Sequence, residues 1–423
     1  MLIESIALQM TPGIGCAGAA HLLEVFGDAR AVFAASAEEL IERAELRPDL
    51  AAELLRKSCF AAAEREAERC HRADVRPIPL TDPAYPPLLR EIPNPPTVLY
   101  VMGDPAALKR PSVALVGTRS ITPYGSEQCR RMVKGLAERI PRLAVVSDLA
   151  AGIPVEVHRV ARACKATSVA VVPCVLPRIT PAHHTGEARL ILENGGAIVS
   201  ELHSQVTQIK PYYVLSCRLI AALSSGCIVI EAPAGSGALN SARCADEFHR
   251  TVMALSGRPT DANMEGAHEL IRSQKAQLVT SADDVIRELM WDLAGAASIP
   301  APPPAPPVAE KRPPKPATPK RPPKTTARYT DPTPEMRVAA DVTTAQPEAA
   351  DLPEPPVFDE ERLSPDEERV LACFNGSDPC TLKEVQARTG FGVQKAYALL
   401  VQLEFGRQLI RGFNGYRYLR RCD

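Results

Sequence analysis

Residues 112–125 read Ser112-Val113-Ala114-Leu115-Val116-Gly117-Thr118-Arg119-Ser120-Ile121-Thr122-Pro123-Tyr124-Gly125, and this stretch decides the fold. Its apolar part, Val113–Val116, predicts a short buried strand that runs straight into a glycine turn carrying Arg119. A helix is expected from about Ser126, after a proline-tyrosine-glycine step. Backbone N–H groups, a helix N-terminus and a fixed positive charge then meet at the carboxyl end of a strand. That arrangement suits an anionic ligand, most simply a phosphate.

Short apolar strands alternate with helical segments on both sides of this stretch, between residues 111 and 290. They are continuous and β-branched, as strands buried on both faces are. They recur at intervals of roughly 25 to 30 residues, which suits βαβ crossovers and predicts an α/β fold with a Rossmann-like, doubly wound, mostly parallel sheet. The expected strands are Val113–Val116, Leu143–Val146, Val169–Val172, Ala197–Val199, Cys227–Ile230, Val252–Leu255 and, as a further candidate, Leu278–Thr280.

The pattern before residue 75 is helical, and Thr11-Pro12-Gly13-Ile14-Gly15 predicts a glycine turn between two short helices. Such a turn either presents N–H groups to a DNA phosphate, as helix-hairpin-helix motifs do, or is a structural turn in a small bundle. The whole chain divides into a helical domain (1–75), a Rossmann-like domain (76–293), a linker (294–362) and a C-terminal winged helix (363–423).

The linker is defined by composition, because 18 of the 41 prolines fall between Pro300 and Pro356. Apolar residues there recur with neither the helical nor the strand spacing, so the segment is expected to be extended and mostly disordered. Its first half is basic and its second half acidic. A solvated spacer is favoured over a partner-binding or DNA-binding tail.

The last 60 or so residues predict three helices and a hairpin, which together make a winged helix. Two capping boxes, Ser364–Glu367 and Thr381–Glu384, begin the first two helices, and a third carries Val393 to Leu403. Asn414-Gly415 is the hairpin turn. The charge bias of this unit is slight, so DNA binding and protein binding stay equally open.

Whole-chain composition restricts the class of protein. The formal net charge is −1, so any nucleic-acid site must be a local patch. The 12 cysteines are scattered without a C-x-x-C pair, which fits a reducing cytoplasm. Met1–Met10 lacks a basic region and carries Glu4, so no signal peptide is expected. No apolar run is long enough for a membrane span, so no membrane partner is expected.

A second glycine turn, Gly235–Ala238, follows the strand that ends at Ile230-Glu231-Ala232 and precedes a helix from about Leu239 to His249. In a parallel sheet both turns lie at the carboxyl edge, where a switch point between their strands forms a crevice for a phosphate-bearing ligand. Neither turn has the spacing of a dinucleotide fingerprint or a Walker A loop. Together they favour an anion site over two ordinary turns.

Further candidates are weaker. The segment Ser147–Gly152 could wall the same crevice, and Arg218 either clamps a phosphate or makes an ordinary salt bridge. His158 either contacts a ligand or packs a helix. His183 and His184 lack partners in metal-ligand spacing, and Glu231 is one acid without a visible partner. No catalytic residue, metal or cofactor is therefore expected. The candidate anion-binding residues are Gly117, Thr118, Arg119, Ser147, Gly152, Arg218, Ser236, Gly237 and Ala238.

Several motifs in fixed order carry a family resemblance: Asp82–Leu89, Pro95–Asp104, Val116–Arg119 with Tyr124-Gly125, Ser200-Glu201, Arg218–Ser224, and Ser236–Leu239 after Glu231-Ala232. They resemble the DprA/Smf family of bacterial DNA-processing proteins. The helical N-terminus and the winged helix are similar to accessory domains of that family.

The resemblance implies a single-stranded DNA-binding recombination mediator that protects incoming strands during natural transformation, helps to load a RecA-type recombinase, acts as a homodimer and performs no catalysis. It also implies that the candidate residues hold DNA phosphates, and that Arg119→Ala or Arg218→Ala weakens binding.

The chain departs from the family pattern in three motifs. Tyr213 and Val214 stand in place of a phenylalanine and a proline, and Ser256 in place of the proline before Gly257. Five further departures fall in two of these motifs. Asp148 stands in place of a glycine, Ala151 of an arginine and Pro154 of an aspartate. Ser216 and Cys217 replace an arginine and an asparagine. Two positive charges are missing and one negative charge is added, so a diverged member with weaker DNA binding or a changed ligand is expected.

Two other classes of protein stay open. One is a nucleotide-processing enzyme on a related Rossmann-like fold, such as a phosphoribohydrolase, although the turn at Gly235–Ala238 lacks the glutamate that such enzymes place there. The other is a scaffold whose central site has decayed and whose winged helix recruits a partner.

Overall fold

The computed structural model of the chain describes residues 1–206, 212–291, 365–374, 381–392, 396, 399–400, 403, 409–412 and 415–418. The predicted linker, 294–362, and most of the predicted third helix of the winged helix lie outside these residues. Within the described ranges no helix is long and apolar enough to cross a membrane.

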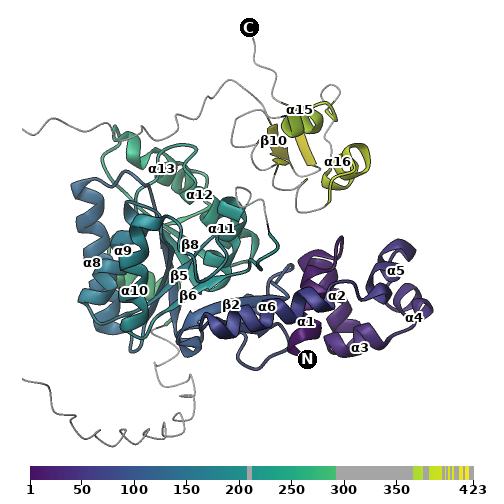
Figure 1. The fold of residues 1–423 in the computed structure, drawn as a ribbon. Helices are drawn as coiled ribbons and strands as arrows, with labels where there is room; N and C mark the ends of the chain where they lie inside the picture. Colours follow the sequence, from purple (N-terminus) through teal and green to yellow (C-terminus); the bar gives the residue numbers. More distant parts are fainter. Residues whose placement is uncertain are drawn as a thin grey trace, which may run out of the picture. The chain divides into compact units, whose positions relative to one another are not determined.

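The first 72 residues fold into helices, as the sequence predicts (Figure 1). The turn between the first two helices is the predicted one, and Gly13 takes a φ of +83° there, which only glycine adopts readily. Ser36 and Glu39 form a capping box that starts the fourth helix. The helices are α1 (Leu2–Met10), α2 (Gly15–Phe26), α3 (Ala29–Ala34), α4 (Ala37–Glu42), α5 (Pro48–Arg56) and α6 (Phe60–Arg72).

A nine-stranded sheet follows, in the order β1-β2-β6-β5-β4-β3-β7-β8-β9. Strands β3 to β9 pair in parallel, so the mostly parallel doubly wound architecture is confirmed, and all seven predicted strands are present within a residue or two. The strands are β1 (Arg76–Pro79), β2 (Val98–Gly103), β3 (Ser112–Val116), β4 (Ala144–Asp148), β5 (Thr167–Val171), β6 (Ala197–Ser200), β7 (Gly226–Val229), β8 (Thr251–Leu255) and β9 (Gln277–Val279).

The sequence prediction missed β1 and β2, which pair antiparallel with each other and, through β2, with β6. Two of the four residues of β1 are prolines, a composition that reads as loop. Proline is tolerated in β1 because this strand lies at the edge of the sheet, where half of its N–H groups need no partner.

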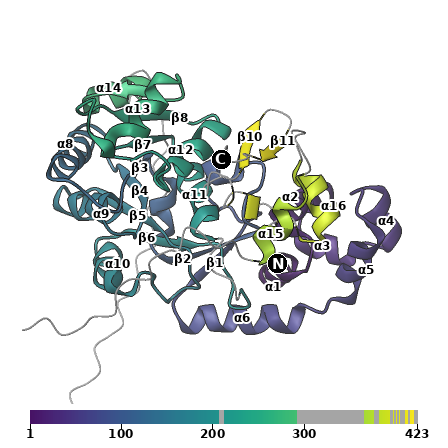
Figure 2. The same cartoon turned by 90° about the horizontal axis from the view of Figure 1, so that it is seen from above.

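Helices cover both faces of the sheet. Helices α8 and α9 lie on one face and α11 and α12 on the other, as Figures 1 and 2 show. The helices of this part are α7 (Pro87–Arg90), α8 (Pro123–Arg139), α9 (Ile153–Ala163), α10 (Thr185–Glu193), α11 (Tyr212–Ala222), α12 (Ala238–Glu247), α13 (Glu265–Arg272) and α14 (Ala282–Glu288), with 3-10 turns at Pro105–Lys109, Ala182–His184 and Ala262–Met264.

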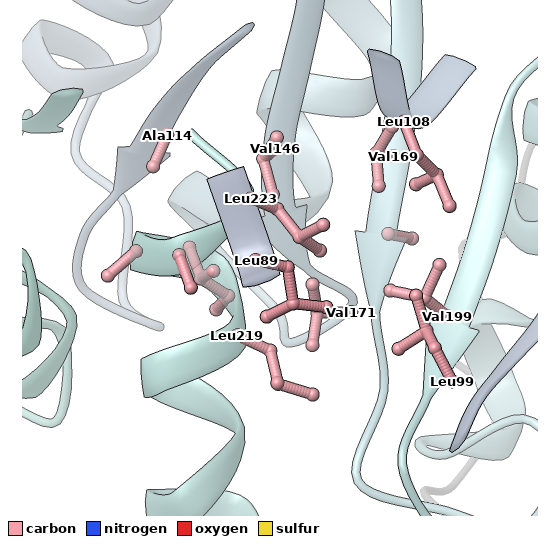
Figure 3. Packing of buried hydrophobic residues seen from close by; sticks show 14 of the residues in the cluster. Leu89, Leu99, Leu108, Ala114, Val146, Val169, Val171, Val199, Leu219 and Leu223 are labelled. Carbon is pink, nitrogen blue, oxygen red and sulfur yellow. The ribbon is translucent and has the colours of Figure 1, made fainter. Parts of the chain in front are cut away.

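The core lies between the sheet and these helices. Val146 of β4 and Val171 of β5 pack beside Leu223 and Leu219, at the end of α11 (Figure 3). All four side chains are almost completely buried, and each contributes about 1.5–3 kcal/mol of burial free energy. This packing fixes α11 against β4 and β5, which lie beside β3 in the sheet.

Helix α8 begins at Pro123, three residues earlier than predicted. The Oγ1 atom of Thr122 accepts a hydrogen bond from the N–H of Gly125 (3.0 Å), and Pro123 occupies the first helical position. The proline-tyrosine-glycine step is therefore the first turn of the helix and not a linker before it.

The described part of the C-terminal unit holds α15 (Pro365–Leu371), α16 (Leu382–Thr389), β10 (Leu409–Gly412) and β11 (Gly415–Tyr418). The capping box of Thr381 and Glu384 is present as predicted. The two strands pair antiparallel, with Gly412 opposite Gly415. Asn414 of the predicted turn lies outside the described residues.

Candidate nucleic-acid interface

The two glycine turns meet at one crevice of about 450 Å³, at the carboxyl ends of β3 and β7. These strands are direct neighbours, with Val116 opposite Val229, although the chain leaves β3 toward β4 and returns to β7 on the other side. This is the switch point at which open α/β sheets bind ligands. Of the candidate residues, the crevice is lined by Gly117, Arg119, Ser236, Gly237 and Ala238.

The first turn is held by backbone hydrogen bonds to two other segments. The N–H of Thr118 donates to the backbone oxygen of Glu231 (2.7 Å), and the oxygen of Thr118 accepts from the N–H of Ile153 (3.0 Å). A Cβ atom on Gly152, which has a φ of +80°, would lie 2.3 Å from the oxygen of Thr118. Thr118 is buried, and Gly152 lies where the backbone of the turn leaves no room for a side chain. Neither residue lines the crevice, so both contribute only to its shape.

The positive end of α8 is already occupied. The carboxylate of Glu231 is fully buried and accepts hydrogen bonds from the N–H (3.2 Å) and the hydroxyl of Thr122. A Cβ atom on Gly125 would lie 2.1 Å from one of its oxygens. The prediction that this helix N-terminus faces an external phosphate is therefore wrong, because an internal carboxylate takes that place.

The N-terminus of α12 is open instead. The Ser236 hydroxyl accepts from the N–H of Ala238 (3.4 Å), and the Ser236 N–H donates to the oxygen of Pro233 (3.1 Å). The N–H groups of Gly235 and Gly237 make no hydrogen bond within the part of the chain that the structure describes, and both residues line the crevice. Two N–H donors and the positive end of a ten-residue helix thus remain for an anion.

Arg119 is the cation of this crevice. Its side chain is exposed, and among the described residues no carboxylate lies within 4 Å of its guanidinium. Most other arginines of this domain are engaged with an acid or a carbonyl. Arg119 is therefore available to an external anion.

Arg218 lies elsewhere. It is 8% exposed, forms a buried ion pair with Glu201, and donates from Nη1 to the oxygen of Asn94 (3.0 Å). It lines a separate cavity of about 70 Å³ and not the crevice. Of the two interpretations offered by the sequence, the structure supports the salt bridge and corrects the phosphate clamp.

Ser147 also has an internal role. It is fully buried, and its hydroxyl donates to the backbone oxygen of Leu115 on the neighbouring strand β3 (2.7 Å). It therefore fixes the end of β4 beneath the crevice and has no free group for a ligand.

Besides Tyr213 and Val214, three of the departures from the family pattern lie in the crevice wall, at Asp148, Pro154 and Cys217. Burial raises the pKa of the Cys217 thiol to about 11, so it is not a reactive thiolate. Ser216 is buried and donates to the oxygen of Tyr213 (3.2 Å), whereas Ala151 is exposed and outside the wall.

The side chain of His158 is hydrogen-bonded to the backbone of Asp148. The ring of His158 donates from Nε2 to the backbone oxygen of Asp148 (3.0 Å), and burial lowers the pKa of His158 to about 4. The imidazole ring is therefore neutral at pH 7, and its role is to pack helix α9, in which it is buried. Burial raises the pKa of Asp148, and the nearby charges of Arg119 and His184 oppose this rise.

Sequence reasoning did not single out Tyr213 and Asn240 as site residues, although both line the crevice. Tyr213 is 41% exposed and lies in the first turn of α11, on one face of the sheet. The sequence signal that could have found it is its place in the segment Tyr213–Arg218, which the resemblance aligns with a family motif.

Comparison with known proteins assigns the chain to a family. Residues 76–290 match the model of the family described as DNA recombination-mediator protein A, and residues 348–411 match that of the DprA winged helix domain. The solved structure of DNA processing protein A from Streptococcus pneumoniae aligns with a TM-score of 0.56 and 27% identity, covering 68% of this chain and 96% of that one.

Two relatives extend the likeness. Protein Smf of Escherichia coli is 37% identical over 216 residues, which are 51% of this chain and 57% of that protein, so the match spans little more than half of it. Protein Smf of Synechocystis is 30% identical over 344 residues, which are 80% of this chain and 79% of that protein. With its mostly parallel sheet, its switch-point crevice and its winged-helix match, the chain belongs to the DprA/Smf family of DNA recombination-mediator proteins.

Proposed function

We propose that the crevice between the two glycine turns holds a phosphate of single-stranded DNA, and that the protein acts as a recombination mediator without catalysis. The observation that carries this proposal is the convergence of Arg119 with the open N–H groups of Gly235 and Gly237 on one crevice. A guanidinium and a helix N-terminus bind a phosphate oxygen without attacking it.

Tyr213, which lines the crevice with Arg119, favours a single strand over a duplex. A crevice of about 450 Å³ has the size of a small-molecule site, which a single nucleotide can fill. The half-exposed ring of Tyr213 offers a stacking surface, and stacking requires a base that is not already paired and stacked in a duplex. Stacking on an aromatic side chain contributes about 1–3 kcal/mol per base.

The wider role follows from family membership. We infer that the chain protects single strands during DNA uptake, helps to load a RecA-type recombinase and works in the cytoplasm as a homodimer.

The proposal excludes chemistry on the bound strand. His158 is neutral and buried, the Cys217 thiol is protonated at pH 7, and Asp148 has no second acid or base beside it among the residues lining the crevice. A general acid or base is most effective when its pKa lies near the operating pH, and neither His158 nor Cys217 meets this condition.

Gel-shift titration with single- and double-stranded oligonucleotides tests the proposal. Arg119→Ala should weaken single-strand binding and lower the slope of log K against log salt by about 0.7, because one phosphate contact is lost. Arg131→Ala is the matched control, since Arg131 is exposed on α8 and, among the residues that the structure describes, bonds only Gln128 (3.4 Å). Equal effects of the two substitutions would contradict the crevice as the binding site.

Two other results would redirect the assignment. Release of free base from nucleotides would favour the enzyme of the phosphoribohydrolase class. Persistent single-strand binding combined with loss of function on truncation at about residue 362 would favour the scaffold whose winged helix recruits a partner.

A further inference from the structure

Asp148 lines the crevice, and one oxygen of its carboxylate has no hydrogen-bond partner within the described residues. Asp148 ends β4, and its Oδ1 atom accepts a hydrogen bond from the N–H of Ala150 (2.7 Å). The structure gives no hydrogen bond for Oδ2 within the described residues, and no cation lies within 4 Å of the carboxylate there. The side chain is one of those that line the crevice.

A partly buried carboxylate with a single N–H partner is poorly compensated. An ionised carboxylate offers about four acceptor positions, and burying it without donors costs free energy. Burial raises the pKa of Asp148 for the same reason. A ligand that brings N–H donors to Oδ2 would remove this cost, whereas a phosphate, which has only acceptors, would add repulsion.

The donors of a DNA strand are on its bases. Guanine carries two adjacent donors, N1–H and N2–H, on its Watson–Crick edge, and these match the two oxygens of a carboxylate. Thymine offers one N–H between two carbonyl oxygens, which a carboxylate repels. Adenine and cytosine offer an amino group beside a ring acceptor. Of the four bases, guanine therefore suits Asp148 best.

The same wall supplies the rest of a base site. Tyr213 provides an exposed aromatic ring, and the polar residues Asn240 and Ser241, both largely buried, are also among the residues that line the crevice. Arg119 and the N–H groups of the second glycine turn are left for the phosphate. The charge of Arg119 also acts on Asp148, so the phosphate site and the base site adjoin within one crevice.

We propose that Asp148 makes this crevice selective for guanine in single-stranded DNA, by accepting hydrogen bonds from the Watson–Crick edge of an unpaired guanine. The inference rests on the proposed single-strand binding and adds a base preference to it. Asp148 is a specificity-determining residue here, because it contributes to the ratio of affinities between bases and not to phosphate binding.

Fluorescence anisotropy with three oligonucleotides tests the inference. All are oligothymidine of one length, and the central position is thymine, guanine or inosine, which lacks the N2 amino group. We expect wild-type protein to prefer guanine over thymine by about tenfold, as a bidentate contact does, with inosine between them.

Two variants separate base reading from charge. Asp148→Asn keeps an acceptor for Ala150 N–H but turns a donor toward the base, so the guanine preference should fall to near one. Asp148→Gly should also abolish the preference and should tighten binding of the all-thymine oligonucleotide, because a negative charge is removed. A preference that survives in both variants would overturn the inference.

The outcomes distinguish the two proposals. Absence of binding to all three oligonucleotides at low salt refutes single-strand binding itself. Binding of wild-type protein with equal affinity for thymine, inosine and guanine leaves single-strand binding standing and refutes the role of Asp148 alone.

Discussion

The carboxylate of Glu231 and the first turn of α8 are joined through Thr122, whose N–H and hydroxyl both donate to it. The backbone oxygen of the same glutamate accepts the N–H of Thr118. One buried residue at the end of β7 therefore holds both ends of the turn that carries Arg119. The second glycine turn begins four residues later, so the two sides of the crevice share this residue as their support.

Replacing Glu231 by Gln should loosen that support. The amide keeps one acceptor but brings an N–H₂ group toward the Thr122 donors, which leaves a buried donor unsatisfied. We expect the free energy of unfolding to fall by about 1–3 kcal/mol, measured by urea titration. Single-strand affinity should fall with it, since Arg119 loses its fixed position. Unchanged stability would show that the bonds to Thr122 contribute nothing.

Gly125→Ala tests the same contact sterically. Alanine normally stabilises a helix by about 1 kcal/mol relative to glycine. Here the added Cβ would lie 2.1 Å from the Glu231 carboxylate, so we expect a lower melting temperature.

The matched control is Gly186→Ala, in α10, where nothing lies within 4 Å of the added Cβ. That substitution should leave the melting temperature unchanged or raise it. A Gly125→Ala protein as stable as the Gly186→Ala protein would rule out the tight packing of Glu231 against α8.

Arg218→Ala should affect stability and not DNA contacts. Removal of the guanidinium leaves Glu201 as an uncompensated buried charge, whose Oε1 atom already has no hydrogen-bond partner. The expected loss is about 3–5 kcal/mol in the free energy of unfolding. The salt slope of single-strand binding, measured below the unfolding transition, should equal that of the wild type. A lower slope would return Arg218 to the list of phosphate ligands.

The stability of the protein should depend on pH through His158. Its pKa is lowered by burial to about 4 in the folded chain, from about 6.5 when unfolded. Protonation therefore favours the unfolded chain, and this contribution to stability is complete above pH 6.5. It should be lost progressively as the pH falls toward 4, by up to about 3 kcal/mol.

His158→Gln isolates this effect, because glutamine can still donate to the backbone oxygen of Asp148 but does not titrate. The difference between the two proteins in unfolding free energy should change between pH 7 and pH 4. A constant difference would mean that His158 is not held neutral by its surroundings.

Much of this fold could be predicted from sequence because its signals are local. Continuous β-branched runs mark the buried parallel strands, and the two glycine turns mark their carboxyl ends. Strand β1 could not be predicted in this way, since its prolines are tolerated only because the strand lies at the sheet edge. That position is a property of the whole sheet.

The site was predictable only in part, for a similar reason. The crevice follows from the order of the strands, but the partners of each side chain do not. Glu231 reaches Thr122 across 109 residues, and Arg218 reaches Glu201 from a neighbouring element. These contacts decide that α8 is closed to a ligand, α12 is open and Arg218 is structural, and no local pattern encodes them.

The most direct measurement is photocrosslinking of an oligothymidine that carries 5-iodouracil, followed by mass spectrometry of the peptides. The cross-link should fall on the peptide that contains Tyr213 and should be lost in Tyr213→Leu. It should persist in Tyr124→Leu, because Tyr124 has the same exposed fraction, 41%, but lies outside the crevice wall. Cross-links confined to the N-terminal helices or to residues 365–418 would contradict the assignment of single-stranded DNA to this crevice.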